Sequence, residues 1–370
     1  MNIGFDGKRV IQNFTGLGNY GRYLLNTLAR FYPQHQYSVF TSKPLEGFNE
    51  LKNYPSVHFK HPQKQVSSSL WRSFGIVNDL KKATIDLYHG LSNELPFGLK
   101  KAGIPSVVTI HDLIFLRYPD YYPFFDRKIY EYKFRYAAEH ANKIIAISEQ
   151  TKTDLMNYFQ ISESRIEVIY QNCDPSFLLK ADESEKLRIR TAYHLPQKYL
   201  LNVGTIETRK NALLIVKALK ELDSEIKLVI LGRETPYAHL IKNYLKVNNM
   251  ESRVLFLKNV PFTALPVIYQ MAEIFIYPSE FEGFGIPIIE ALSSGRPVIA
   301  AKGSCLEEAG GPGSVYVDPD DSIELASQIN SIFYDDELKS SMISSGFNHL
   351  KQFSDEKIAE KQINLYKNLI

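Results

Sequence analysis

The sequence predicts an α/β protein made of two doubly wound domains, each built on a parallel sheet. The chain has 370 residues, more than one small hydrophobic core requires. Short apolar runs of strand length alternate with helical patterns, an arrangement typical of parallel sheets covered by helices. The alternation begins again near Tyr199, which divides the sequence into two similar halves.

Each expected strand is a short run rich in Val, Ile, Leu or Tyr. Those of the first half are residues 2–5, 37–40, 106–110 (SVVTI), 143–148 (KIIAIS) and 167–170 (EVIY). Those of the second half are residues 199–204 (YLLNVG), 227–232 (KLVILG), 254–259 (VLFLKN), 273–279 (EIFIYPS), 297–301 (PVIAA) and 315–319 (VYVDP). Runs this short and apolar are expected to be buried on both faces of a sheet.

A polar stretch marks the approach to the boundary between the halves. Residues 182–187 (DESEKL) are rich in charge and have no strand character. We therefore expect a first domain over residues 1–180 and a second over residues 181–354. Two doubly wound domains that face each other would place the carboxyl ends of their strands, and hence a ligand crevice, between them.

A glycine-rich stretch near the N-terminus raises the question of dinucleotide binding. Residues 14–25 (FTGLGNYGRYLL) carry Gly16 and Gly18 within the spacing G-x-G-x-x-G, but residues 6–15 separate them from the first expected strand. The second expected strand is followed by Thr, Ser and Lys, where a dinucleotide fold has an acidic residue for the ribose. NAD is therefore disfavoured. A glycine loop ahead of an amphipathic helix over residues 20–28 still offers N–H groups to a phosphate, with a plain tight turn as the alternative.

Charge is unevenly distributed along the chain. The net charge is +2, but residues 1–180 carry 22 Lys and Arg against 16 Asp and Glu, while residues 181–370 carry 21 against 25. The first half is thus expected to meet an anionic partner, either a phosphate-bearing substrate or a membrane surface, unless it is simply a solvated surface. The sequence has no basic run and no nucleic-acid-binding motif, which argues against a nucleic-acid partner.

The N-terminus and the cysteines indicate the compartment. No apolar run approaches the length of a membrane span, and the first residues lack the order of charge, apolar stretch and small residues of a signal peptide. Cys173 and Cys305 have no metal-ligand spacing and are expected to be reduced packing residues. We expect a cytoplasmic protein.

An aromatic and basic stretch, residues 115–136 (FLRYPDYYPFFDRKIYEYKFRY), gives the first half a second feature. A stretch of this kind suits a lipid interface, which favours both aromatic rings and basic tips. It equally suits a helix packed on its own domain through Tyr130, Phe134 and Ala138. The first domain is therefore a candidate for peripheral membrane association, with the packed helix as the competing interpretation.

The most informative segment of the second half is residues 278–301 (PSEFEGFGIPIIEALSSGRPVIAA). A strand ends at its start, and a helix is expected to begin near its Ile-Pro pair, because proline suits the first helical turn. Glu282 would then precede the helix N-terminus, and Glu290 would lie about one turn inside the helix. The glycines let a ligand approach the backbone of Phe284 and Gly285 closely.

The pair Glu282 and Glu290, with seven residues between them and GFG after the first, resembles the signature of the retaining glycosyltransferase family 4. Four further segments resemble motifs of that family, in the family's order. They are GLGNYGR (16–22), VTIHDL (108–113), ISEQTKTDL (147–155) and NVGTIETRKN (202–211). The resemblance spans nearly the whole chain and implies the GT-B fold, in which two Rossmann-like domains face each other across an interdomain cleft. In that fold the C-terminal helix, here residues 355–370, returns to the first domain.

The resemblance implies that one group of residues holds the nucleotide. Glu290 would accept hydrogen bonds from the ribose hydroxyls, since both carboxylate oxygens are acceptors. Arg209 and Lys210, which follow Gly204, would neutralise the diphosphate with charge-assisted hydrogen bonds.

A second group would hold the sugar of the donor. Glu282 would bind its hydroxyls, near the backbone N–H groups of Phe284 and Gly285. His111 would point into the cleft and contact the sugar, with a structural histidine at a strand end as the alternative. The glycines that would close over the donor from the first domain are Gly16 and Gly18. The catalytic set implied by the resemblance is His111, Glu282, Arg209 and Lys210.

The implied activity is a retaining transfer of a sugar from a nucleotide diphosphate donor to a hydroxyl of a saccharide or lipid-linked saccharide in polysaccharide biosynthesis. Residues 202–211 and 303–311 (GSCLEEAGG) are most similar to the mannosyltransferase branch, which suggests GDP-mannose, with UDP-sugars as the alternative. Two other classes share the fold. They are a nucleotide-sugar 2-epimerase, which would turn over the donor without an acceptor, and a non-catalytic nucleotide-sugar-binding protein.

Neither a metal nor another cofactor is expected. Arg209 and Lys210 would supply the positive charge that Mg²⁺ otherwise brings to a diphosphate. Residues 318–320 (DPD) form a D-x-D, which holds a divalent metal in another glycosyltransferase fold, but here it follows an expected strand and is interpreted as a turn.

Overall fold

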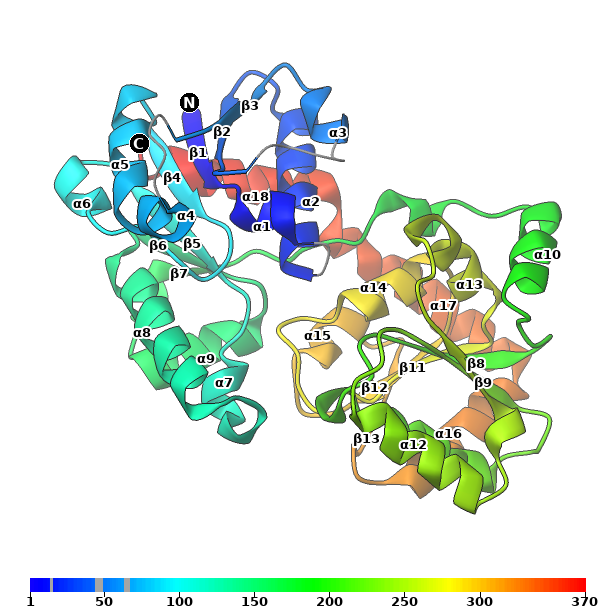
Figure 1. The fold of residues 1–370 in the computed structure, drawn as a ribbon. Coiled ribbons are helices and arrows are strands. Elements are labelled where there is room, and N and C mark those ends of the chain that lie inside the picture. The colour runs from blue at the N-terminus through cyan, green and yellow to red at the C-terminus, as the bar shows by residue number, and fades with distance from the viewer. Residues whose placement is uncertain (14–15, 44–48, 63–66) are drawn as a thin grey trace. The chain divides into compact units, whose positions relative to one another are not determined.

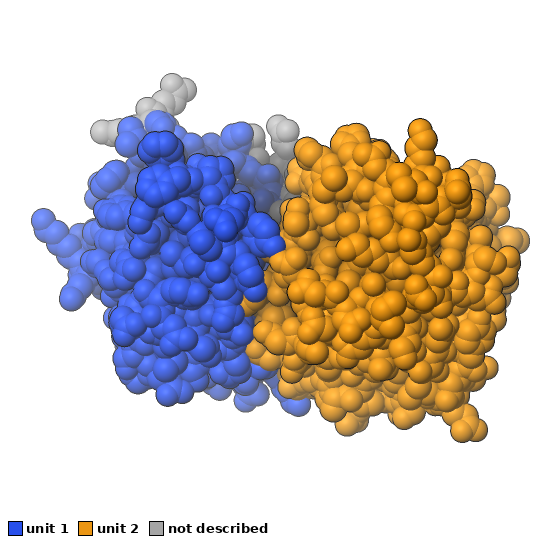
Figure 2. Space-filling view, turned by 90° about the horizontal axis from the view of Figure 1, so that it is seen from below, with its two compact units in different colours: residues 1–172, 353–370 blue, residues 173–352 orange. Residues whose placement is uncertain are grey.

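The computed structural model describes residues 1–13, 16–43, 49–62 and 67–370. Phe14 and Thr15, which open the glycine-rich stretch, lie outside the described residues. The chain forms two compact units, the first from residues 1–172 and 353–370 and the second from residues 173–352 (Figure 2). Each unit has its own parallel sheet and its own hydrophobic core.

The first unit is built on a seven-stranded parallel sheet in the order β3-β2-β1-β4-β5-β6-β7 (Figure 1). Its strands are β1 (Asn2–Asp6), β2 (Gln36–Phe40), β3 (Val57–Lys60), β4 (Leu87–Gly90), β5 (Ser106–Ile110), β6 (Lys143–Ala146) and β7 (Ile166–Val168). The order reverses between β1 and β4, and ligands of such sheets bind at the carboxyl edge near this switch point.

Helices connect the strands of the first unit. They are α1 (Lys8–Gln12), α2 (Gly16–Phe31), α3 (Asn49–Lys52), α4 (Ser68–Leu70), α5 (Ile76–Lys82), α6 (Leu99–Ala102), α7 (Ile114–Arg117), α8 (Phe124–His140), α9 (Glu149–Phe159) and α18 (Asp355–Lys367). α18 follows the second unit in the sequence but packs alongside α2 (Figure 1). Its residues Ile358, Ile363 and Tyr366 are buried in one core with Leu24 and Leu28 of α2.

The second unit is built on a six-stranded parallel sheet in the order β10-β9-β8-β11-β12-β13. Its strands are β8 (Tyr199–Val203), β9 (Lys227–Leu231), β10 (Val254–Leu257), β11 (Ile274–Tyr277), β12 (Val298–Ala301) and β13 (Val315–Val317). Its helices are α10 (Glu183–Ala192), α11 (Ala212–Ala218), α12 (Tyr237–Val247), α13 (Leu265–Met271), α14 (Ile286–Ser293), α15 (Leu306–Gly310), α16 (Ser322–Phe333) and α17 (Asp336–Leu350). The order reverses between β8 and β11, so this unit repeats the topology of the first.

The predicted architecture of two Rossmann-like parallel sheets is confirmed. Two strands of the first sheet differ from the expectation, because β3 (VHFK) and β4 (LYHG) were not predicted. Both are four residues long and contain a histidine, and β4 ends in glycine. Neither therefore has the branched apolar run that marks the other strands.

The boundary between the units lies nearer the N-terminus than the expected boundary after residue 180. Residues 173–178 pack on the second unit: the Phe177 ring meets the Tyr269 ring at 5.4 Å, and the Cys173 thiol lies 3.4 Å from the Ser293 hydroxyl. The polar stretch that suggested the later boundary has a local purpose, since Asp182 caps α10 by accepting a hydrogen bond from the backbone N–H three residues on.

The glycines near the N-terminus lie within α2 and not in a loop ahead of it, because the helix already begins at Gly16. Gly18 is required by packing, since a Cβ atom there would lie 1.8 Å from the Asn13 carbonyl oxygen. A Cβ on Gly16 would meet no described atom within 4 Å. Arg22 of α2 binds the end of α1, because its guanidinium donates hydrogen bonds to the carbonyls of Val10 and Asn13 at 2.7 and 2.9 Å.

Within the aromatic stretch, α8 has one face packed on its own unit and one exposed face. On the inner face, Tyr130 and Phe134 pack around Phe115, with ring centroids 6.0 and 5.2 Å away. On the outer face, Phe125 and Tyr132 are 79% and 63% exposed. Within the described part of the chain, no helix is both long and apolar enough to cross a membrane.

Candidate active site

The carboxyl edge of the second sheet gathers most of the predicted site residues. β8 is followed by Gly204, whose φ of 145° is a backbone conformation that glycine adopts readily. Gly232, directly after β9, packs so closely that a Cβ there would lie 1.8 Å from the Gly204 carbonyl oxygen. A single 3-10 turn, Thr208–Lys210, then carries Arg209 and Lys210 ahead of α11.

Arg209 and Lys210 converge on one carboxylate, that of Glu282. The Arg209 Nη1 atom lies 2.8 Å from Glu282 Oε1, and the Lys210 ammonium contacts the same oxygen. Two hydroxyls also donate to Oε1, from Ser279 at 2.6 Å and from Tyr277 at 3.1 Å. β11 ends at Tyr277, so this strand delivers both hydroxyls to the turn that holds Glu282.

The charges around Glu282 determine its protonation. Burial alone would raise the pKa of its carboxyl, but the cations Lys210 and Arg209 outweigh burial and lower this pKa to about 2. Glu282 is therefore ionised at physiological pH. Within the described residues, every contact of this carboxylate ends on Oε1. The other oxygen, Oε2, is thus the one that can accept a hydroxyl of a ligand.

The two cations are also held by groups other than Glu282. Arg209 donates through Nη1 to the Phe281 carbonyl at 2.5 Å and pairs through Nη2 with Glu207 at 2.8 Å. The Lys210 ammonium lies 4.8 Å from the centre of the Tyr277 ring. These contacts fix the direction of both side chains before a ligand arrives, which lowers the entropic cost of binding one.

The turn between β11 and α14 is shaped by Gly285 and Cys305. Gly285 has a φ of 142° and stands directly before the first residue of α14. The Cys305 thiol lies 3.0 Å from the carbonyl oxygens of both Glu282 and Phe284, where it can donate to either. Cys305 is therefore more than a packing residue, because it supports the turn that carries Glu282.

We call Glu282 and the four residues that bind its Oε1, namely Arg209, Lys210, Tyr277 and Ser279, the Glu282 cluster. Glu290 lies in α14 and is not part of this cluster. Its Oε2 accepts a hydrogen bond from the hydroxyl of Tyr269, a buried residue of α13, at 2.8 Å. Burial raises the pKa of Glu290 to about 7, against the opposing effect of the Tyr269 bond. Two carboxyl groups of one segment thus have opposite surroundings, one beside cations and the other beside a phenol.

His111 belongs to the first unit, where it directly follows β5. Its backbone N–H donates to Asn93 Oδ1 at 2.8 Å, and its ring donates through Nε2 to the Leu91 carbonyl at 2.9 Å. Burial lowers the pKa of His111 to about 4, so the ring is neutral at physiological pH. A neutral ring that donates through Nε2 has Nδ1 as its acceptor.

The structure thus brings Arg209, Lys210 and Glu282 into contact and leaves Glu290 in a separate contact with Tyr269. Three side chains of these clusters were missed by sequence reasoning. They are Tyr269, Tyr277 and Ser279. The last two carry a usable signal, because they close a strand directly ahead of Glu282, at the edge where ligands bind. Tyr269 lies in an ordinary apolar helix, and no sequence pattern links it to Glu290.

The D-x-D motif forms a turn after β13, as interpreted from the sequence. Asp318 Oδ1 accepts a hydrogen bond from the Asp320 N–H at 3.0 Å, and Asp318 Oδ2 pairs with Lys302 at 3.2 Å. Across residues 1–13, 16–43, 49–62 and 67–370, no group of three His, Cys, Asp or Glu side chains has the arrangement of a metal site.

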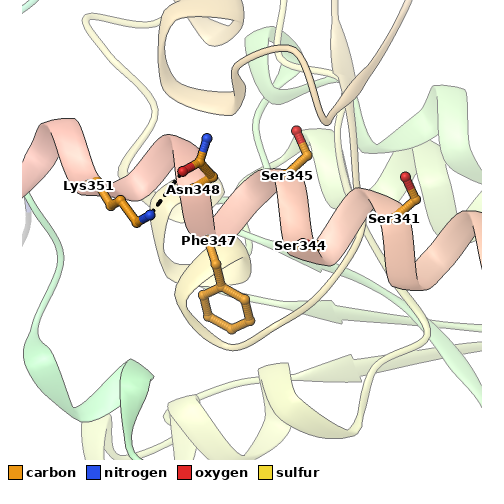
Figure 3. A pocket seen from close by; sticks show the side chains of 6 residues that line it. All are labelled: Ser341, Ser344, Ser345, Phe347, Asn348 and Lys351. Carbon is orange, nitrogen blue, oxygen red and sulfur yellow. Dashed lines mark hydrogen bonds between the residues drawn. The ribbon is translucent and has the colours of Figure 1, made fainter.

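A groove of about 610 Å³ runs along α17 in the second unit. It is lined by Ser341, Ser344, Ser345, Phe347, Asn348 and Lys351 (Figure 3). Figure 3 shows Ser345 and Asn348 on one side of the helix and the Phe347 ring on the other. The side chains do not converge on one point, and none of them belongs to the predicted site, so this groove is not the candidate active site.

Two family models match the chain. The model described as Glycosyltransferase Family 4 matches residues 14–177, and the model described as Glycosyl transferases group 1 matches residues 183–349. Together the two matches extend over most of the sequence, one in each predicted domain.

Two related proteins and one solved structure are also similar to the chain. O-antigen chain mannosyltransferase B of Escherichia coli is 29% identical over 288 residues, which cover 76% of this chain and 74% of that protein. O-antigen chain mannosyltransferase RfbU of Salmonella typhimurium is 28% identical over 227 residues, which cover 61% of this chain and 60% of that protein. The structure of Anabaena Alr3699/HepE with UDP and glucose covers all of both chains, with a TM-score of 0.78 at 19% identity, and shows the shared fold.

Proposed function

This chain belongs to glycosyltransferase family 4, in its mannosyltransferase-like branch, and from that premise we propose that it transfers mannose from GDP-mannose to a hydroxyl of a saccharide or lipid-linked saccharide. The transfer retains the configuration of the sugar and needs no metal ion. The names of the two O-antigen relatives support a growing polysaccharide as the acceptor. The GT-B fold of the chain supports a nucleotide sugar as the donor.

The Glu282 cluster is the observation that carries this proposal. Arg209 and Lys210 stand just ahead of α11, where the helix macrodipole disfavours cations. Two fixed cations at such a place suit a polyanion, and a diphosphate can accept charge-assisted hydrogen bonds from both. The ionised Glu282 holds the pair until the diphosphate arrives, and its Oε2 remains an acceptor for the sugar.

The other predicted residues have chemistry that fits the rest of the donor. Glu290 keeps one carboxylate oxygen for the ribose while Tyr269 donates to the other. His111 is neutral, so its Nδ1 can accept a hydrogen bond from a sugar hydroxyl, which a protonated imidazole could not do.

The proposed reaction exchanges one bond for another at the anomeric carbon. The bond from this carbon to the β-phosphate oxygen breaks, and a bond to the acceptor oxygen forms on the same face of the sugar. The acceptor hydroxyl gives its proton to the departing phosphate oxygen, so the atoms balance without a protein nucleophile. Arg209 and Lys210 stabilise the charge that develops on the diphosphate, which is the main electrostatic demand of the step.

A panel of GDP- and UDP-sugars, each with and without a mannose-ended oligosaccharide, tests the proposal. We expect GDP-mannose to be consumed when the acceptor is present, with an α-linked product seen by NMR and full activity in excess EDTA. Consumption of the donor without acceptor would instead indicate an epimerase, and preference for a UDP-sugar would correct the donor. Loss of activity in EDTA that Mg²⁺ restores would contradict the role given to Arg209 and Lys210.

We further propose that α8 places the first unit on an anionic lipid surface. Phe125, Ile129 and Tyr132 follow the spacing i, i+4, i+7, so they form one stripe on the helix, and they are 79%, 52% and 63% exposed. Lys128 and Lys133 flank this stripe, and the spacing puts them on its two sides. Exposed rings bordered by basic groups suit the boundary between headgroups and acyl chains.

Sedimentation with vesicles tests the lipid proposal. The protein should bind vesicles that contain phosphatidylglycerol and should bind neutral phosphatidylcholine vesicles weakly. Replacing Phe125, Ile129 and Tyr132 together by serine should abolish binding, whereas the same change at three exposed residues of the second unit should not. The control residues are Leu240, Val247 and Tyr334. Equal binding by both triple variants would rule out α8 as the contact.

A further inference from the structure

A line of buried hydrogen bonds crosses the first unit from α18 to α2. The Tyr366 hydroxyl lies 2.6 Å from His89 Nδ1, and His89 Nε2 lies 2.8 Å from Thr109 Oγ1. Thr109 Oγ1 in turn lies 3.0 Å from the Tyr20 hydroxyl. The four residues come from α18, β4, β5 and α2, and each is at most 4% exposed. We call these four residues the buried polar chain.

The buried polar chain ends against His111. The Tyr20 ring meets the His111 ring edge-on, with centroids 4.7 Å apart and an interplanar angle of 88°. This is a favourable arrangement for two aromatic rings, and it limits the rotation of the imidazole. Tyr20 also lies in α2 two residues after Gly18, so it connects His111 to the helix that carries both predicted donor-facing glycines.

The same hydrogen bonds align the strands on which His111 depends. His89 lies two residues before Leu91, whose carbonyl accepts from the His111 ring. Thr109 likewise lies two residues before His111 itself. The hydrogen bond between His89 and Thr109 therefore joins β4 to β5 two residues before Leu91 and His111.

Hydrogen-bond donors and acceptors can be matched along the whole buried polar chain. Burial lowers the pKa of His89 to about 3, so its ring is neutral and has one donor and one acceptor nitrogen. The hydroxyls on either side can each take the opposite role, so both nitrogens can be paired. Polar groups buried without partners are destabilising, and an apolar core would need none of these groups. Their presence is better explained by orientation than by burial.

We propose that the buried polar chain positions His111, so that the ring orientation which offers Nδ1 to the donor sugar depends on α18 being docked against α2. The chain residues do not touch the substrate; they are positioning residues. The proposal rests on the proposed function in taking His111 as a donor contact. Its central statement, that Tyr366 controls the geometry of His111 through His89, Thr109 and Tyr20, concerns the protein alone.

Single-atom changes test the proposal without opening a cavity. Tyr366→Phe removes one hydroxyl from the start of the chain, and Thr109→Val replaces the central hydroxyl by a methyl group. Tyr37→Phe is the matched control, because Tyr37 is equally buried in the first unit and its hydroxyl donates to the carbonyls of Leu28 and Tyr32. Circular dichroism spectra and melting curves establish that each variant is folded. If Thr109→Val does not fold, Tyr366→Phe alone is sufficient for the test.

The first measurement is the ¹⁵N NMR spectrum of the imidazoles, with the His111 signals assigned from the spectrum of His111→Gln. In the wild type we expect the pattern of a neutral ring protonated at Nε2. Tyr366→Phe and Thr109→Val should shift the His111 signals or mix the two tautomers, and Tyr37→Phe should leave them in place. Unchanged His111 signals in the first two variants would overturn the proposal.

The second measurement is a double-mutant cycle on transfer activity. Tyr366→Phe should lower kcat about 10-fold with little change in the KM for donor, because misplacement of a contact group mainly affects the reacting geometry. The same change made in His111→Gln should cause no further loss. An equal loss in both backgrounds would mean that Tyr366 acts through general stability. If His111→Gln itself keeps full activity, the donor role of His111 is wrong, and the NMR result still decides the positioning.

Discussion

Glu282 and Glu290 show how strongly the surroundings of a single residue decide its chemistry. The first is ionised between two cations and has a pKa of about 2, whereas burial raises the pKa of the second to about 7. The sequence places them in one segment and gives no sign of this difference. It arises because the charges of Arg209 and Lys210, which reach Glu282 from another element, outweigh burial there, whereas burial prevails at Glu290 despite the hydrogen bond from Tyr269.

Replacing the two glutamates by alanine should separate nucleotide binding from transfer. Glu290→Ala should weaken GDP and GDP-mannose alike, since both carry the ribose, at a cost of about 1.5–3 kcal/mol. Glu282→Ala should leave GDP affinity nearly intact, because both cations remain available to the diphosphate, while transfer falls. Calorimetric titration with GDP and a transfer assay compare the two variants. An equal loss of GDP affinity in both would show that this division of the site is wrong.

The protonation of Glu290 should also be visible in stability. Because its pKa is raised, the stability associated with its protonated form is fully present below about pH 4.5 and is lost as the pH rises to about 7. The side chain in Glu290→Gln does not titrate. This variant should therefore be more stable than the wild type by on the order of 3 kcal/mol at pH 8, and should have no such advantage at pH 5. Melting curves from pH 5 to 8 measure this.

Glu282→Gln is the control for this prediction, since the pKa of Glu282 is lowered and its ionised form is stabilised by the cations. Its replacement should reduce stability at pH 8, which is the opposite sign. A fall in stability of both variants at pH 8 would contradict the protonation given to Glu290.

At the scale of elements, α2 shows that a helix can begin where the sequence suggests a loop. Glycine is a poor helix former, so a stretch with Gly16 and Gly18 predicts a loop ahead of the helix expected over residues 20–28. The structure instead uses the missing side chains to bring α1 against the first turns of α2, where Gly18 approaches the Asn13 carbonyl. Close packing of this kind depends on tertiary structure, which local propensity does not contain.

The two first glycines of α2 should respond differently to alanine. Gly18→Ala forces a Cβ onto the Asn13 carbonyl and should destabilise the protein by about 1–3 kcal/mol, with a matching fall in Tm. Gly16→Ala meets no described atom and should leave Tm nearly unchanged. Under the proposed function, Gly16→Ala should instead reduce the affinity for GDP-mannose. Equal destabilisation by both changes would contradict the packing role of Gly18.

The elements that were predicted well are those whose local sequence carries the whole signal. β11 and the start of α14 follow from an apolar run and an Ile-Pro pair, and α14 does begin at Ile286. β4 was missed because LYHG owes its place to pairing with β1 and β5 on either side. In the site, Glu282 and Glu290 were recognisable by spacing, whereas the contact of Glu290 with Tyr269 joins two helices that no motif connects.

At the scale of the whole molecule, the first unit is discontinuous in sequence. The chain leaves it after Asn172 and returns at Phe353. Hydrogen bonds join the point where the chain leaves the first unit to the point where it comes back. Asn172 Nδ2 and the Tyr23 hydroxyl both donate to Asp355 Oδ1, at 3.0 and 2.9 Å. The Tyr170 and Phe353 rings also meet edge-on at 5.3 Å. α18 is therefore an integral part of the first unit.

Removal of α18 should affect the two units unequally. A chain that ends at Gln352 lacks the side chains that share a core with α2, so amide hydrogen exchange should show lost protection in the first unit. The second unit keeps all of its residues and should keep its protection. Removing residues 368–370 is the control and should change little. Uniform loss of protection in both units would show that they do not fold as separate bodies.

The distance in sequence between Asn172 and Phe353 also sets an order of events during synthesis. At about 5–20 residues per second, a ribosome needs roughly ten to forty seconds to make the intervening second unit. During that time the second unit can complete its core, while the first unit exposes the face of α2 that α18 will later cover. An exposed apolar face of this kind can bind chaperones or another nascent chain. The unit that is translated first is thus the last to be finished.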